Sequence, residues 1–123
     1  MLNLSPRLTA TIAESRAKPR VGYPWWLRPW LARDVIAITL GRTIYLSVRA
    51  AERPLERLEP LLRHELAHVR QVNRHGFFGF IARYLGEFLR HFLRVRSVNR
   101  AYAMISFEIE ALAAEKDEER TAL

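Results

Sequence analysis

The pentapeptide His64-Glu65-Leu66-Ala67-His68 places two histidines and a glutamate at a spacing suited to metal-assisted hydrolysis. Residues four positions apart on an α-helix lie on one face, so the two imidazoles project together. Two imidazoles in this arrangement can ligate a tetrahedral Zn²⁺ ion through bonds of about 2.0–2.1 Å. Glu65 is then placed to take a proton from a metal-activated water as a general base. The motif predicts zinc-dependent hydrolysis, with His64 and His68 as ligands and Glu65 as the catalytic residue.

The sequence around this motif has the period of an α-helix. No glycine or proline interrupts residues 61–74, and Gly76 is a natural C-terminal stop, so a helix over residues 55–74 is predicted. Its apolar positions are Leu55, Leu58, Leu61, Leu62, Leu66, Val69 and Val72. The alternative is that His64 and His68 are ordinary surface histidines and that Glu65 is merely solvated. The helical context favours the metal site.

A catalytic zinc site keeps three protein ligands, so one further ligand must come from elsewhere. His75 is excluded, because it lies about 10 Å beyond His68 along an unbroken helix. On a helical wheel of the last predicted helix, Glu108 falls within the apolar sector and Glu110 on the polar side. That sector comprises Ala101, Ile105, Ile109 and Leu112, flanked by Met104 and Ala111. A buried carboxylate is costly unless it is paired or bound to a metal. Glu108 is therefore the preferred third ligand and Glu110 the fallback, while pairing of Glu108 with an arginine is the alternative.

Two further roles are open to residues outside the ligand set. Glu115 lies two turns after Glu108 on the same helix face, where it could orient a ligand histidine. A group that stabilises a tetrahedral oxyanion is also needed. Candidates for that group are Tyr102, His75, His91 and several arginines.

The elements that position these residues are those of a small α+β domain. Ser5-Pro6 is a helix start, which predicts a helix over residues 6–17. Residues 18–29 contain three prolines and predict an ordered loop, with the aromatics Tyr23, Trp25, Trp26 and the following Trp30 packed over the core. Two β-branched runs, 35–40 and 43–48, are separated by Gly41-Arg42 and predict a tight hairpin.

Two more helices are predicted beyond the motif, over residues 77–95 and 100–118. The first is rich in phenylalanine and has a polar stripe of Arg83, Glu87, Arg90 and Arg94, with His91 beside it. This pattern suits a helix packed on most sides, although a basic amphipathic surface helix has the same pattern. The predicted fold is a hairpin or small sheet packed on the motif helix, with these two helices added. A single domain over 1–123 is expected, with a helix and aromatic loop (1–34), a catalytic core (35–118) and a tail (119–123).

The composition limits which residues can bind a metal and argues against a secreted or membrane-spanning protein. The chain of 123 residues has no cysteine, which excludes disulfides and thiolate zinc sites, so any metal must be held by His, Asp, Glu and water. Its start lacks a basic region followed by an apolar run, and no uncharged apolar stretch reaches about 18 residues. Neither a signal peptide nor a transmembrane helix is therefore predicted, and we expect a cytoplasmic protein.

The charge balance is strongly basic. The net charge is +7, and Lys18 and Lys116 are the only lysines, so nearly all positive charge is arginine. This balance indicates either an anionic partner (nucleic acid, anionic lipid or an acidic substrate) or an arginine-rich coding bias. No recognisable nucleic-acid-binding motif accompanies it, whereas peripheral contact with an anionic membrane remains open.

The H-E-L-A-H helix, followed some 40 residues later by Glu108-Ile109-Glu110-Ala111, resembles the gluzincin class of zinc metallopeptidases. The short chain is most similar to the minimal single-domain forms, the minigluzincins, over residues 35–118. The resemblance implies Zn²⁺ held by His64, His68 and Glu108, with Glu65 as general base and acid in peptide-bond cleavage by a metalloendopeptidase. It also implies an extended peptide or protein substrate paired with a sheet edge, and a homodimer or latent form in small members. The position four after Glu108 is often acidic or an amide in gluzincins, but here it is Leu112.

Two other classes of function remain open from the sequence. One is a catalytically silent zincin-like domain that binds metal for a regulatory purpose. The other is a basic module for anionic membrane or nucleic acid, built on residues 77–95, which predicts salt-dependent binding and no stoichiometric metal.

Overall fold

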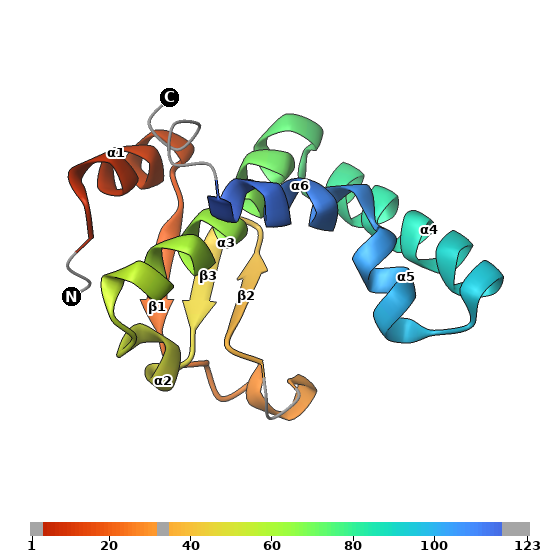
Figure 1. The fold of residues 1–123 in the computed structure, drawn as a ribbon, viewed down its shortest axis with the longest axis horizontal. Coiled ribbons are helices and arrows are strands. Elements are labelled where there is room, and N and C mark those ends of the chain that lie inside the picture. Colours follow the sequence, from red (N-terminus) through yellow and green to blue (C-terminus); the bar gives the residue numbers. More distant parts are fainter. Residues whose placement is uncertain (1–3, 32–34, 117–123) are drawn as a thin grey trace.

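The computed structural model describes residues 4–31 and 35–116, which form an α+β domain with a mixed sheet (Figure 1). Helix α1 (Pro6–Ser15), strand β1 (Lys18–Val21) and the 3-10 turn η1 (Arg28–Trp30) come first. They are followed by the hairpin β2 (Ala37–Leu40) and β3 (Thr43–Leu46), the short α2 (Val48–Ala51) and the long α3 (Leu55–His75). The chain continues through α4 (Phe77–Val95), α5 (Val98–Met104) and α6 (Ser106–Lys116). The predicted α+β class is confirmed.

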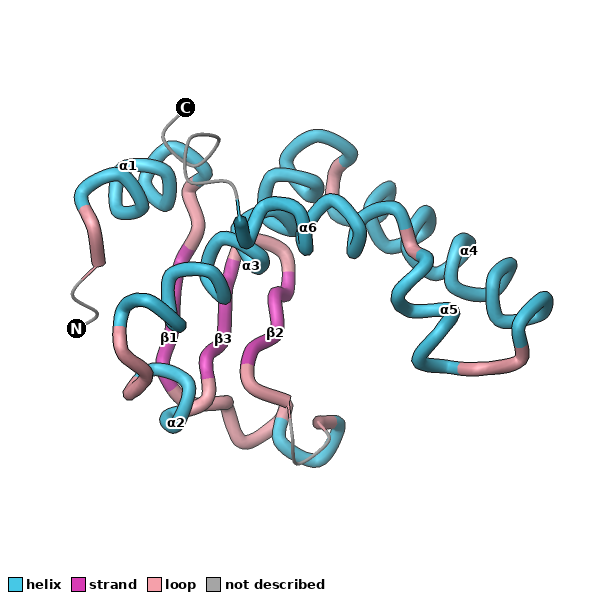
Figure 2. The backbone as a smooth tube through the Cα atoms, viewed as in Figure 1, coloured by secondary structure: helices cyan, strands magenta, loops and turns pink. Residues whose placement is uncertain are grey.

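The sheet has the order β1-β3-β2, with β1 parallel and β2 antiparallel to the central β3. The predicted hairpin is present, because Leu40 pairs with Thr43 across Gly41-Arg42. Gly41 has a φ of 63°, in the left-handed region that tight two-residue hairpin turns require. The central position of β3 leaves β2 as an edge strand on the side nearest α4 (Figure 2).

The interpretation of residues 18–29 as loop alone was wrong, since β1 occupies their start. Lys18 N donates to Arg42 O and Gly22 N donates to Leu46 O, so alternate residues of β1 bond to β3. Pro19 lies between these donors, and its missing N–H therefore falls on the open edge, where a strand tolerates proline. A parallel partner some 25 residues away leaves no local signal in the sequence.

The expectation that the aromatics of this segment pack over the core was wrong for Trp25 and Trp26. Trp25 is 83% exposed, and Trp26 is largely exposed and touches Tyr45 only edge-on, with ring centroids 6.4 Å apart. Tyr23 is held by its hydroxyl, which donates to the carbonyl oxygen of Val35 at 3.0 Å. The side chain of Trp30 lies outside the described set.

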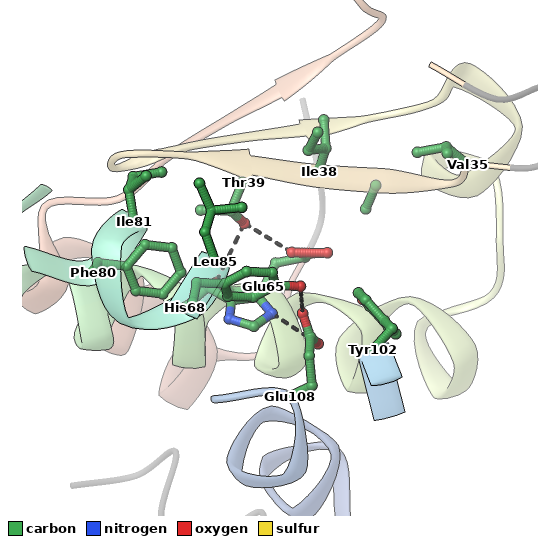
Figure 3. Close-up of a pocket in the computed structure, with 12 residues that line it drawn as sticks. Val35, Ile38, Thr39, Glu65, His68, Phe80, Ile81, Leu85, Tyr102 and Glu108 are labelled. Atoms are coloured by element: carbon green, nitrogen blue, oxygen red, sulfur yellow. Dashed lines mark hydrogen bonds and ion pairs between the residues drawn. The ribbon is translucent and has the colours of Figure 1, made fainter. Parts of the chain in front are cut away.

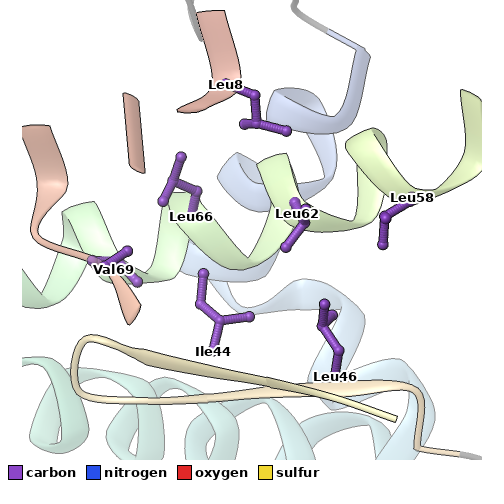
Figure 4. Close-up of a cluster of buried hydrophobic side chains, with 8 residues drawn as sticks. Leu8, Ile44, Leu46, Leu58, Leu62, Leu66 and Val69 are labelled. Atoms are coloured by element: carbon purple, nitrogen blue, oxygen red, sulfur yellow. The ribbon is translucent and has the colours of Figure 1, made fainter. Parts of the chain in front are cut away.

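The main core lies between β3 and the inner face of α3, with α1 closing one end (Figure 4). Its fully buried side chains are Leu8, Ile44, Leu46, Leu58, Leu62, Leu66 and Val69. Polar contacts fix α1 to α3, since Glu59 accepts from Ser5 N at 2.8 Å and Asn73 donates to Ser15 O at 3.0 Å. This core holds one face of α3 rigidly, so the opposite face presents the motif residues in fixed positions.

The single helix predicted over 100–118 is in fact two helices. Ile105 is extended, with φ −63° and ψ 128°, and separates α5 from α6. After this break α6 packs on α3 through the small residues Ala67, Ala111 and Ala114. Ile109 and Leu112, which the wheel placed in the apolar sector, are therefore exposed. Residues 117–118 lie outside the described residues, as does the predicted tail.

Helices α4 and α5 form an arm, defined as residues 77–104, that projects away from the sheet (Figure 2). No described residue of α4 is buried, so the expectation of a helix packed on most sides was wrong, and the surface-helix alternative fits better. The arm is fixed at its base, where Phe80 stacks on Phe107 with ring centroids 5.1 Å apart. No helix in the described part of the chain is long and apolar enough to cross a membrane.

Candidate metal centre

His64, His68 and Glu108 come together although 40 residues separate the last two. Each offers one ligand atom, and the three atoms lie within 4.8 Å of one another. The Nε2 atoms of both histidines are 3.2 Å from Glu108 Oε1. Ligand atoms at the corners of a tetrahedral zinc site lie about 3.3 Å apart, as bonds of about 2.0–2.1 Å require. The donor set therefore fits a divalent metal ion.

The second histidine is oriented by a glutamine one turn further along α3. His68 Nδ1 and Gln71 Oε1 are 2.9 Å apart, and Gln71 is completely buried. The amide nitrogen of Gln71 donates to Phe107 O and to Glu110 Oε1, each at 3.0 Å. These bonds fix the amide, so its oxygen faces the imidazole and assigns the proton of His68 to Nδ1, leaving Nε2 for a metal. Sequence reasoning missed this role.

The first histidine is accompanied by Glu115, as the sequence predicted. His64 Nδ1 is 3.2 Å from Glu115 Oε1, an ion-pair distance, although the two atoms are not aligned for a hydrogen bond. Arg63 fixes this end of α6, because its guanidinium donates to the carbonyl oxygen of Glu115 from Nη2 at 2.6 Å and from Nε at 3.1 Å. Glu115 thus takes the place beside a ligand histidine that Leu112, which is exposed, does not fill.

The carboxylate of Glu108 is braced from the arm. The hydroxyl of Tyr84, on α4, donates to Glu108 Oε2 and leaves Oε1 directed at the two histidines. Tyr84 was missed in the sequence because it is one aromatic residue in a phenylalanine-rich helix. Its position three residues before Glu87 of the polar stripe carries no signal of a contact with α6.

Glu65 lies beside the ligands but is not one of them. Its side chain is buried, and Thr39 Oγ1 donates to Glu65 Oε2 at 2.8 Å (Figure 3). Thr39 belongs to β2, so the edge strand orients the predicted catalytic carboxylate. This contact depends on the packing of β2 against α3 and could not be inferred from local sequence.

The charges in the centre are strongly coupled in the metal-free protein. Burial raises the pKa of the Glu108 carboxyl, but hydrogen bonds from His64, His68 and Tyr84 outweigh burial, so the pKa lies well below its usual range. Burial lowers the pKa of each histidine, but the bond to Glu108 and the negative charges of Glu108 and Glu65 together raise it by more, so the net shift is upward for both. Burial and then Glu108 raise the pKa of Tyr84, which therefore stays protonated. A divalent cation would replace the protons that hold this cluster together.

A cavity of about 420 Å³ opens above the centre, between β2 and α4 (Figure 3). Its polar floor includes Glu65, His68 and Glu108. Its walls are apolar, with Val35, Ala37 and Ile38 on the strand side and Phe80, Ile81 and Leu85 on α4. The metal centre thus lies at the bottom of an apolar cleft bounded by a strand edge.

The other candidates for third ligand and for oxyanion donor differ in how close they lie to the centre. Glu108 is 6% exposed, whereas Glu110 is 43% exposed and is engaged by Gln71 and, at 3.8 Å, by Arg74. His75 packs on Phe107, and neither it nor His91 lines the cavity. Tyr102 does line it. Burial and then the nearby Glu108 raise the pKa of Tyr102, so its hydroxyl keeps the proton that an oxyanion donor needs.

Comparison with known proteins gives a partial match. Residues 31–76 match the eCIS core domain. Some members of that family are related to zincin-like metallopeptidases. The match covers the hairpin and the whole of α3, including His64 and His68, but ends before the arm and before Glu108. No curated protein and no solved structure matches the chain.

Proposed function

We propose that this protein is a zinc metallopeptidase of the gluzincin kind, with zinc held by His64, His68 and Glu108. The single observation that carries the proposal is the convergence of these three ligand atoms from α3 and α6 within 4.8 Å. The match of residues 31–76, which contain the motif, to the eCIS core domain is consistent with the proposal. Gln71, which is hydrogen-bonded to His68, and Glu115, which lies at ion-pair distance from His64, belong to the pattern of orienting groups that metal-binding histidines need.

In this proposal zinc supplies Lewis-acid activation of a water molecule and of the scissile carbonyl. Glu65 accepts a proton from the attacking water and delivers it to the leaving amine nitrogen. The hydroxyl of Thr39 holds Glu65 Oε2, which leaves Oε1 free to take that proton. Tyr102 stands in the cavity wall as a donor for the oxyanion.

The edge of β2 favours a peptide as the substrate. Ser47 N donates to Ile36 O, so the backbone N–H and C=O of Ile36 face β3. Because these directions alternate along an antiparallel strand, the backbone groups of Ile38 and Leu40 face β3 as well. The backbone groups of Ala37 and Thr39 consequently face the open edge, beside the cavity. An extended peptide could pair with these groups and place a carbonyl above the ligands.

The test combines metal analysis with a peptide-library digest. We expect one zinc per chain in wild type and in Glu65→Gln, with hydrolysis reduced about 10²–10⁴-fold in that variant alone. Glu56→Gln is the matched control, because Glu56 is an exposed glutamate on the same helix. Absence of stoichiometric zinc after soaking in zinc salts would overturn the proposal.

The silent regulatory domain is the other outcome of the same experiment. Zinc at one per chain with no cleavage of any library peptide, by wild type or by Glu56→Gln, would favour it. Equal turnover in wild type and Glu65→Gln would remove Glu65 from the mechanism.

A further inference from the structure

An apolar stripe runs along the exposed side of α4. Ile81, Leu85, Leu89 and Leu93 follow one another at intervals of four residues, and their exposed fractions are 37%, 59%, 56% and 53%. At 100° per residue these four positions span about 120° of the helix surface. Phe78, which is 82% exposed, projects within the same arc. Ile81 and Leu85 also line the cavity, whereas Phe78, Leu89 and Leu93 lie outside it. Large apolar side chains exposed side by side in this way indicate an interaction site.

The charges on the same arm are almost all positive. Residues 77–104 contain five arginines against one carboxylate, Glu87. Glu87 is already engaged, because it accepts from the backbone nitrogen and the hydroxyl of Ser106. Among the described residues no carboxylate lies within ion-pair distance of any of the five. They are Arg83, Arg90, Arg94, Arg96 and Arg100.

The arginines of α4 lie beside the apolar stripe on the helix surface. Arg90 lies about 60° from Leu93 around the helix, so a long arginine stem can lie along the edge of the apolar face while its guanidinium reaches outward. The stripe on one side and a basic flank beside it are the features of a helix that lies in the plane of a bilayer interface. Since no described helix could cross a membrane, contact would be peripheral.

From these features we infer that the α4–α5 arm docks on an anionic lipid bilayer. The leucines of the stripe enter the acyl boundary, and the arginines contact the headgroup phosphates. A second copy of this chain fits less well, because its arm would bring five more positive charges to the contact. Nucleic acid fits less well too, because phosphates provide no apolar partner for the leucines. The inference is independent of catalysis and needs no metal.

The first test is flotation of the full chain with vesicles of neutral phosphatidylcholine, alone or with about 30% anionic phosphatidylglycerol. We expect binding to the anionic vesicles only, and weakening of that binding by salt. The double variant Leu89→Glu and Leu93→Glu should reduce partitioning at least tenfold. Its matched control is Ile109→Glu with Leu112→Glu on α6, which adds the same charge at positions 56% and 55% exposed.

The contribution of charge is tested in the same way. Arg90→Gln with Arg94→Gln should lower partitioning about 25-fold, because each cation near the surface contributes about fivefold. Arg49→Gln with Arg57→Gln removes two exposed arginines from α2 and α3 and should change binding far less. Equal losses in both pairs would show a diffuse effect of net charge and would overturn the assignment to the arm.

A second measurement does not depend on destabilising substitutions. The chain has no cysteine, so Leu89→Cys can carry a single environment-sensitive fluorophore, with Leu112→Cys as the control. Anionic vesicles should shift the emission of the label at 89 to the blue and leave the label at 112 unchanged. No shift at 89, no flotation of wild type, or a lipid-free dimer that Leu89→Glu with Leu93→Glu dissociates would each overturn the proposal. Metal binding and hydrolysis are measured without lipid, so their failure would be separate.

Discussion

The body of the protein, formed by the sheet with α3 and α6, differs sharply from the arm. In the body, apolar residues such as Ile44, Leu66 and Val69 are fully buried, and the polar groups of the centre are bonded to one another. In the arm, no residue of α4 is buried, and no carboxylate of the described residues lies within ion-pair distance of the arginines. One small chain therefore combines a buried part, which gathers the candidate ligands, with an arm whose apolar stripe stays exposed.

The largest contrast is expected in stability. Leu66→Ala in the core should lower the free energy of unfolding by about 2–5 kcal/mol, because it leaves a cavity under α3. Leu89→Ala on the stripe should change it by about 0.5 kcal/mol or less. Urea denaturation followed by circular dichroism measures both. A comparable loss in Leu89→Ala would mean that the stripe is packed in solution, and the contrast would fail.

Metal binding should stabilise the body without help from the stripe. Free zinc at about 100 times its dissociation constant should raise the free energy of unfolding by about 2.7 kcal/mol. Glu108→Gln should weaken zinc binding about 100-fold or more, whereas Glu110→Gln, two residues along the same helix, should have a much smaller effect. Calorimetric titration gives the affinities, and Leu89→Glu with Leu93→Glu should keep the full stabilisation. Equal effects of the two glutamine variants would leave the third ligand unassigned.

A smaller difference is expected between two groups that orient the metal ligands, one in the body and one in the arm. Gln71→Ala removes the partner of His68 within the body and should weaken zinc affinity about 10–100-fold. Tyr84→Phe removes a hydroxyl that the arm donates to Glu108, and the expected loss of zinc affinity is about 10-fold or less. Zinc titration of both proteins at one pH measures the effects. A larger loss in Tyr84→Phe would make the arm part of the centre.

The smallest expected effect is the pH dependence of the metal-free protein. The raised pKa values of His64 and His68 add stability that is full below their unfolded value of 6.5 and is lost as pH rises through the folded values. The lowered pKa of Glu108 adds stability that is present above 4.5 and is lost as pH falls toward its folded value. Glu65 and Glu115 also face the cluster. The metal-free protein should be most stable between about pH 4.5 and 6.5.

With zinc bound, stability should instead increase as pH rises from about 4.5 toward 8. Zinc binding requires both imidazoles to be neutral, so zinc affinity strengthens with pH. Thermal melts from pH 4 to 8, with and without zinc, measure the two profiles. The variant His64→Gln, His68→Gln, Glu108→Gln should lose both trends. A profile of the metal-free protein unaffected by this triple change would contradict the coupling.

The local part of the fold could be predicted from sequence. The hairpin at Gly41-Arg42, the motif helix and the bounds of α4 depend on short-range patterns and are confirmed. Glu108 could be preferred over Glu110 because a buried carboxylate must be paired or bound to a metal. Glu108 is the glutamate that lies with the histidines. The wheel was nonetheless centred wrongly, since Ile105 interrupts the helix and alanines rather than Ile109 face α3.

Contacts between distant segments could not be predicted. Strand β1 exists because β3 lies beside it, and Thr39 and Tyr84 meet Glu65 and Glu108 only after the edge strand and the arm have packed. Gln71 could have been found, because it lies one turn after His68 on the same face and a glutamine in an apolar stripe needs a partner. Burial of α4 was overestimated because apolar content alone does not reveal which side meets water.

The arm leaves the body and returns to it at nearly one point. His75, the last residue of α3, packs at a tilt against Phe107 in the first turn of α6, with ring centroids 5.4 Å apart. The segment between these two residues therefore begins and ends at nearly the same place. A change in the length of this segment would leave both ligand-bearing helices in place, whereas exchange of the whole arm would also remove Tyr84 from Glu108. The surface that the arm presents can thus change while His64, His68 and Glu108 stay together.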